Sequence, residues 1–153
     1  MKVKALGAIL LGSALLFGCA SMINVPWTEA SSTVKIEQTD VALNASVWRN
    51  KMPTLNESKT FALHGTVVLS SDKMIPADVI VKSIWLRHDD EVLQVDEGSF
   101  DVEAINEQQW KVSFKQDDDF NGEISNADLA VELDNGTHQI WLVNSSIDVD
   151  TVY

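Results

Sequence analysis

Apolar and polar side chains alternate along most of the chain beyond residue 34. The clearest runs cover residues 41–47, 61–69, 110–114 and 129–133. Because a β-strand points successive side chains to opposite faces, each run predicts a strand with one buried face and one wetter face. Residues 79–86 are apolar on both faces, which predicts a central strand. This period of two leaves little room for a fold built on helices.

Turn residues separate these runs. Asn135-Gly136 lies between residues 129–133 and a further apolar run over residues 140–143, and is the strongest hairpin signal in the chain. Residues 88–91 predict a second tight turn, between residues 85–86 and residues 92–93, and residues 70–73 together with Pro76 break the chain between two further strands. About seven strands result, which is the pattern of an all-β, antiparallel β-sandwich of immunoglobulin-like or fibronectin-like type. A small β-barrel is the alternative fold.

The first 18 residues have the organisation of a secretory signal peptide. Lys2 and Lys4 precede a mostly apolar run over residues 5–17, and Gly18-Cys19 follow it. A membrane-spanning helix needs about 20 apolar residues, so this run is too short to span a bilayer. The leader therefore predicts export of the chain.

Leu16-Phe17-Gly18-Cys19 resembles the lipobox of bacterial lipoproteins, in which a leucine and two small-to-medium residues precede an obligatory cysteine. The resemblance implies that the leader is cut before Cys19, that the thiol is diacylated, and that the new amine is acylated with a chain such as palmitate. Two or three acyl chains anchor a protein stably, whereas one binds only marginally. Ala20 and Ser21 lack the aspartate that retains many such proteins in the inner membrane, which implies the outer membrane and a periplasm-facing domain.

The chain then divides into a signal peptide over residues 1–18, a lipidated tether over residues 19–33 and a β-sandwich domain over residues 34–153. Loss of Lys2 and Lys4 with the leader changes the formal net charge from −12 to −14. Such a chain is repelled by anionic headgroups and by phosphates, so we expect no nucleic-acid partner. Membrane contact is expected through the lipid anchor alone.

Sequence signatures of common enzymes are missing from the chain. Neither a glycine-rich phosphate loop nor a G-x-S-x-G elbow occurs, and the single cysteine is assigned to the lipid. His64, His88 and His138 are scattered without metal-ligand spacing. These absences favour a non-enzymatic protein.

One acidic stretch has the spacing of a metal site. Residues 117–128 resemble the twelve-residue calcium loop of EF-hands and dockerins, with Gly122 at the sharp turn. Calcium takes six to eight oxygen ligands, and an affinity of about 10⁻⁴ to 10⁻³ M is typical of extracellular modules. The candidate ligands are Asp117, Asp119, Asn121, the carbonyl of Glu123, a water held by Ser125, and Asp128. The flanks alternate like strands and not like helices, so a solvated acidic loop is the alternative.

The expected function is that of a binding, assembly or envelope-maintenance module with a protein partner in the envelope. Any sandwich offers an edge strand that can accept a partner strand. A ligand-binding module, for calcium or a glycan, is the alternative. The tryptophans bear on this choice because they either fill the core or form an exposed binding platform on one sheet. They are Trp27, Trp48, Trp85, Trp110 and Trp141.

Overall fold

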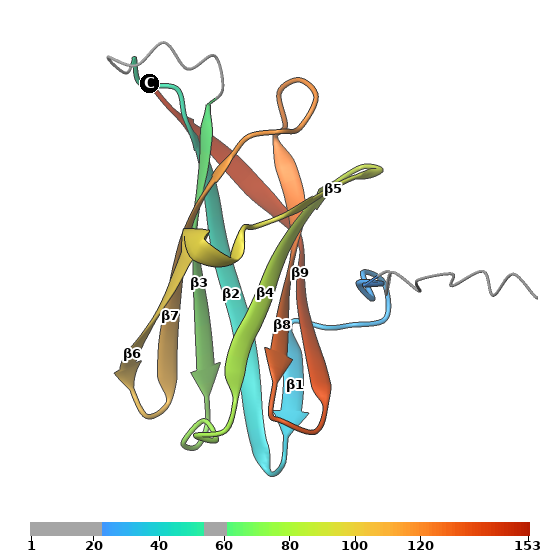
Figure 1. Cartoon of the computed structure of the whole chain (residues 1–153), viewed down its shortest axis with the longest axis vertical. Coiled ribbons are helices and arrows are strands. Elements are labelled where there is room, and N and C mark those ends of the chain that lie inside the picture. Colours follow the sequence, from blue (N-terminus) through green and yellow to red (C-terminus); the bar gives the residue numbers. More distant parts are fainter. Residues whose placement is uncertain (1–22, 54–60) are drawn as a thin grey trace, which may run out of the picture.

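The computed structural model describes residues 23–53 and 61–153 of the chain (Figure 1). Within these residues the elements are nine strands and one 3₁₀ turn, which confirms the predicted all-β class. The elements are β1 (Thr33–Ile36), β2 (Thr39–Asn50), β3 (Ala62–Ser71), β4 (Ile80–His88), β5 (Glu91–Gln94), η1 (Glu97–Ser99), β6 (Phe100–Asn106), β7 (Gln109–Asp117), β8 (Asn126–Asp134) and β9 (Gln139–Val152).

The strands form two layers. One layer has the order β2-β3-β7-β6, and the other has the order β5-β4-β8-β9. Strand β9 joins them, because residues 139–148 pair antiparallel with β8 and residues 149–152 pair parallel with β2. These layers reproduce the two sheets of an immunoglobulin-like sandwich, with β1 added as a hairpin partner of β2. Among the described strands the hydrogen-bonded path ends at β5 and β6, so the sheet does not close into the alternative barrel.

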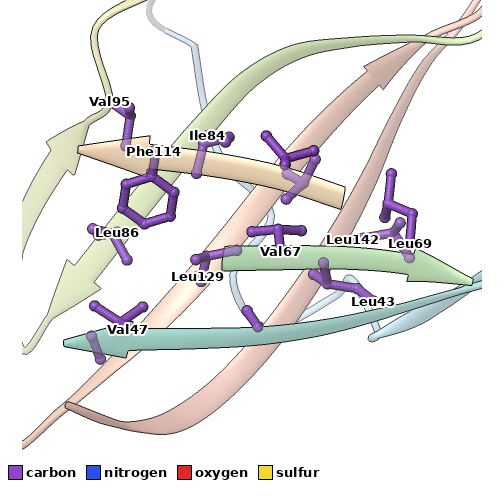
Figure 2. Close-up of a cluster of buried hydrophobic side chains, with 14 of the residues drawn as sticks. Leu43, Val47, Val67, Leu69, Ile84, Leu86, Val95, Phe114, Leu129 and Leu142 are labelled. Atoms are coloured by element: carbon purple, nitrogen blue, oxygen red, sulfur yellow. The ribbon is translucent and has the colours of Figure 1, made fainter. Parts of the chain in front are cut away.

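The core lies between the layers and is built from every second residue of their strands. Figure 2 shows Leu43, Val67 and Phe114 from one layer meeting Ile84, Leu86 and Leu129 from the other. Side chains such as Val67 and Leu129 are fully buried. Burying a valine or leucine contributes about 1.5–3 kcal/mol each, so this interlayer contact is the main source of stability.

The turns follow the predictions in place and differ in detail. Strands β4 and β5 are joined by two residues, of which Asp89 has a positive φ of 51°. The Asn135-Gly136 hairpin joins β8 and β9 through four residues, and in it Gly136 has a φ of 89°. The Asn135 side chain closes this loop, because its Oδ1 accepts hydrogen bonds from the backbone N–H groups of Thr137 and His138.

Strand β9 carries a bulge where it passes from one layer to the other. The register against β8 shifts between Ala127 and Leu129, so that β9 holds one extra residue there. Ser146 sits in this bulge with a φ of 55°, a conformation that serine adopts rarely. Its backbone N–H donates to Oδ1 of Asp128 at 2.9 Å. The bulge is therefore held by a side chain of the neighbouring strand.

Gly65 of β3 is required by the close approach of an aromatic ring. A Cβ atom built on Gly65 lies 2.1 Å from ring carbons of Phe114, which faces it directly across the β3–β7 pair. Phe114 is itself buried in the interlayer core, so the ring has no room to move away.

We expect Gly65→Ala to destabilise the domain by about 1–3 kcal/mol through overpacking, measured by urea unfolding. Gly98→Ala is the matched control, because a Cβ at Gly98 meets nothing within 4 Å. Combining Gly65→Ala with Phe114→Leu should restore part of the loss. A Gly65→Ala variant as stable as the wild type would contradict this close approach.

Candidate functional site

The N-terminal segment packs on the outer face of the β4–β8–β9 layer. Val25 is buried there against Ala130 and Val143, and forms with them a second apolar cluster separate from the interlayer core. The backbone continues this contact, because the N–H of Val143 donates to the carbonyl of Ser31 at 3.0 Å. The sequence predicted a tether over residues 19–33, but from Val25 onward this stretch is part of the folded body.

The tryptophans do not form a single group. Trp27, Trp85 and Trp141 are partly buried together in the outer-face cluster. Trp110 packs against the interlayer core, and Trp48 stacks on His64 on the outer face of the other layer, with ring centroids 5.6 Å apart. The five residues are thus divided between the core and two outer faces, and do not make one exposed platform.

Arg87 connects the N-terminal segment to the bulge of β9. Its guanidinium carbon lies 4.8 Å from the ring centre of Trp27. Its Nε and Nη2 donate to Oδ2 of Asp128 at 3.0 Å and 2.7 Å. Because Oδ1 of Asp128 already accepts from the Ser146 N–H, both carboxylate oxygens of Asp128 serve the fold.

A buried carboxylate lies on the same outer face. Glu132 is almost fully buried, and its Oε2 accepts a hydrogen bond from the Ser83 hydroxyl at 2.6 Å. Ser83 Oγ in turn accepts from the indole N–H of Trp85 at 2.8 Å. The ammonium group of Lys82 lies 3.7 Å from the other Glu132 oxygen. Buried charges require such partners, and these contacts link β4 to β8.

The acidic loop begins where β7 ends. Its buried anchor is Asp118, a residue outside the predicted ligand set, whose Oδ2 lies 2.5 Å from Nε of Arg49. Both side chains of this ion pair are nearly fully buried. Phe120 and Ile124 also turn into the interlayer core. The loop is thus held against the domain by one buried ion pair and two apolar side chains.

The exposed residues of the loop bond to neighbouring strands. The backbone and side-chain N–H groups of Asn121 donate to Glu91, and these bonds lower the pKa of Glu91 below its usual value. Glu123 pairs with Lys51, whose hydrogen bond and charge lower the pKa of Glu123. Folded-state pKa values below the unfolded ones mean that both contacts stabilise the fold above the ordinary glutamate pKa and are lost as the pH falls.

The structure does not gather the predicted calcium ligands around one point. Asp128 is bound by Arg87, and Asp117 is the exposed last residue of β7. Asp119 contacts Asp117 through the backbone, with its N–H donating to the Asp117 carbonyl at 3.1 Å. Among residues 23–53 and 61–153, no group of three or more His, Cys, Asp or Glu side chains is placed to hold a metal ion. The geometry therefore favours the alternative reading of an acidic loop, and calcium binding stays a prediction.

The histidines are also held apart. His88 Nδ1 lies 2.7 Å from the carbonyl of Asn126 at the start of β8, and His138 follows the end of that strand. A nine-residue strand spans about 30 Å, so these two rings cannot share a ligand. His64 stacks on Trp48, where burial and then the charge of Lys115 lower its pKa.

The lipidation residue Cys19 lies outside the described residues. Within the part of the chain that the structure describes, no helix has the length and apolar character needed to cross a membrane. Comparisons with protein families, curated proteins and solved structures find no significant match for this chain.

We expect Arg49→Leu to destabilise the domain by about 3 kcal/mol, because it leaves the Asp118 carboxylate buried without a partner. The double variant Arg49→Leu/Asp118→Leu should lose much less, since it removes both charges. Urea unfolding measures both, and Glu123→Gln is the control because it weakens an exposed pair. Equal losses in the Arg49 and Glu123 variants would show that the buried pair has no special weight.

The calcium hypothesis is tested by thermal unfolding in EDTA and then in about 5 mM calcium. A site of the predicted affinity stabilises the fold by about 1–2 kcal/mol at this concentration. We expect no change in the midpoint, because Arg87 already holds the side chain of Asp128 and the described acidic side chains do not gather around one point. A rise that Asp119→Ala abolishes would establish the calcium site instead.

Proposed function

We propose that this chain is a non-enzymatic lipoprotein of the bacterial envelope. Acyl chains on Cys19 anchor it in the outer membrane, with the domain facing the periplasm. The immunoglobulin-like sandwich acts as a binding and assembly module for another envelope protein. The lipobox-like sequence Leu16-Phe17-Gly18-Cys19 is the single observation on which the anchor rests.

The packed N-terminal segment limits how far the domain could lie from the proposed lipid anchor. Val25 is the first buried residue of the described chain, and it follows Cys19 by six positions. Six extended residues span at most about 20 Å. A lipid-anchored Cys19 therefore holds the outer face of the β4–β8–β9 layer near the bilayer surface, far closer than a free fifteen-residue tether would.

The negative net charge of the domain argues against the domain lying flat on the membrane. The mature chain carries a net charge of −14, which opposes adsorption to anionic headgroups. A body held near the bilayer by lipid alone presents its remaining faces to the periplasm.

The polar groups of the acidic loop and outer face support a binding role over a catalytic one. Asp118, Asp128 and Glu132 each face a cation of the same domain. The hydrogen bonds of Asp128 and Glu132 join strands to one another. These carboxylates therefore contribute to the architecture of the sandwich, and its surfaces and strand edges are what it offers to a partner.

We expect Cys19→Ser to move the protein from the detergent phase to the aqueous phase in Triton X-114 partitioning, because the acyl chains can no longer be attached. Ser21→Ala is the control, since it leaves the cysteine in place two residues away. Mass spectrometry of the wild-type N-terminus should show the acyl groups. A Cys19→Ser protein that still enters the detergent phase and carries acyl mass would contradict the proposed lipid anchor.

A further inference from the structure

Two strand edges are left open on one side of the sandwich. Strand β6 pairs only with β7 among the described strands, and it ends the hydrogen-bonded path of its layer. In the other layer β5 pairs with residues 85–88 of β4, so residues 80–83 of β4 have a strand neighbour only on the β8 side. The free edges of β6 and of the first half of β4 therefore border the same side of the molecule.

An apolar groove of about 330 Å³ lies between these two edges. It is lined by Val79, Ile80, Val81, Val102, Ala104 and Trp110. Ile80 and Val102 are 57% and 46% exposed, whereas most valine and isoleucine side chains on the core-facing sides of the other strands are buried. Exposed apolar side chains that gather around a groove are typical of a surface that binds a partner.

Chain connections cross between the two layers beyond both ends of β6. The chain crosses from β5 to β6 through η1 at one end, as Figure 1 shows. At the other end the N–H of Ile75 donates to the carbonyl of Glu107 at 2.9 Å, which ties the β3–β4 loop to the β6–β7 turn. Between these crossings lies the seven-residue length of β6. The groove thus fits a short extended segment.

The negative charge of β6 favours a bound segment that carries positive charge. Asp101 and Glu103 alternate with the apolar Phe100, Val102 and Ala104, and the strand holds no lysine or arginine. Both acids are exposed, and neither forms an ion pair within the described residues. A second copy of β6 that paired antiparallel with Val102 opposite Val102 would place Asp101 opposite Glu103, and like charges in that position repel. The edge therefore favours a basic partner over a second copy.

The groove is also accessible in an anchored protein. In Figure 1 the N-terminal segment leaves the sandwich beside β9, on the opposite side of the molecule from β6. The start of the described chain and strand β6 therefore lie on different sides of the domain, and an anchor attached before residue 23 leaves the groove open to an envelope protein.

We propose that this groove binds an extended segment of a partner protein in which apolar residues alternate with lysine or arginine. The segment adds as a strand to the free edge of β6. Its apolar side chains enter the groove between Val102 and Ile80, and its basic side chains meet Asp101 and Glu103. This inference rests on the proposed binding role and names the surface and the partner chemistry for it.

The test uses the full mature chain with Cys19→Ser, so that no detergent micelle competes for the probe. The probe is a labelled peptide of about seven residues that alternates valine and lysine, and fluorescence anisotropy measures its binding. A peptide that alternates valine and glutamate is the charge control. A block peptide with the composition of the probe is the pattern control.

We expect the valine–lysine peptide to bind at least about tenfold more tightly than either control peptide. Val102→Asp should weaken its binding by a similar factor, because the new charge lies in the groove. Val92→Asp is the matched control, since Val92 is 49% exposed on the other edge strand, β5. Hydrogen exchange should show new protection of amides in β6 when the peptide is bound.

Three results would overturn the proposal. They are no binding below about 1 mM of the alternating basic peptide, equal binding of the acidic peptide, or equal binding by the Val102 and Val92 variants. None of these results depends on how the wild-type protein partitions in Triton X-114. Failure of the groove and failure of the lipid anchor are therefore observed separately.

Discussion

One strand belongs to both layers of this protein, and the rest of the sandwich depends on it. Strand β9 pairs with β8 along its first part and with β2 along its last four residues. Without that exchange the layers would be joined only by side-chain contacts and connecting loops. The exchange needs a bulge at Ser146, and the bulge needs an acceptor for its backbone N–H, which Asp128 supplies. A carboxylate on β8 thus supports the connection between two sheets.

The same logic explains where the acidic residues with partners lie. Asp118 directly follows β7, Asp128 and Glu132 lie on β8, and each of the three meets a cation from another strand. A cation site would need several carboxylates to turn toward one point, whereas here each turns toward its own arginine or lysine. The buried polar groups therefore specify how strands are placed against each other.

The period of two predicted much of the fold because alternate burial is a property of each strand alone. The seven runs read from the sequence became β2, β3, β4, β5, β7, β8 and β9. Strands β1 and β6 were not among these runs, although Phe100, Val102 and Ala104 of β6 alternate with two acids. The role of Asp128 could not be read, because its partner Arg87 is 41 residues away and only the folded sheet brings them together. The packing of Val25 was hidden for the same reason.

The docked N-terminal segment has a mechanical consequence. Under the proposed anchoring of Cys19 in the bilayer, a force that pulls the domain away acts first on Val25 and Trp27. Their contacts lie on the outer face of one layer, outside the core between the layers. These contacts can break one after another before the force acts on the strands of the sandwich. The stretch from residue 25 to residue 32 would then extend under load while the strands of the domain stay folded. This segment would lengthen the connection between the proposed anchor and the domain.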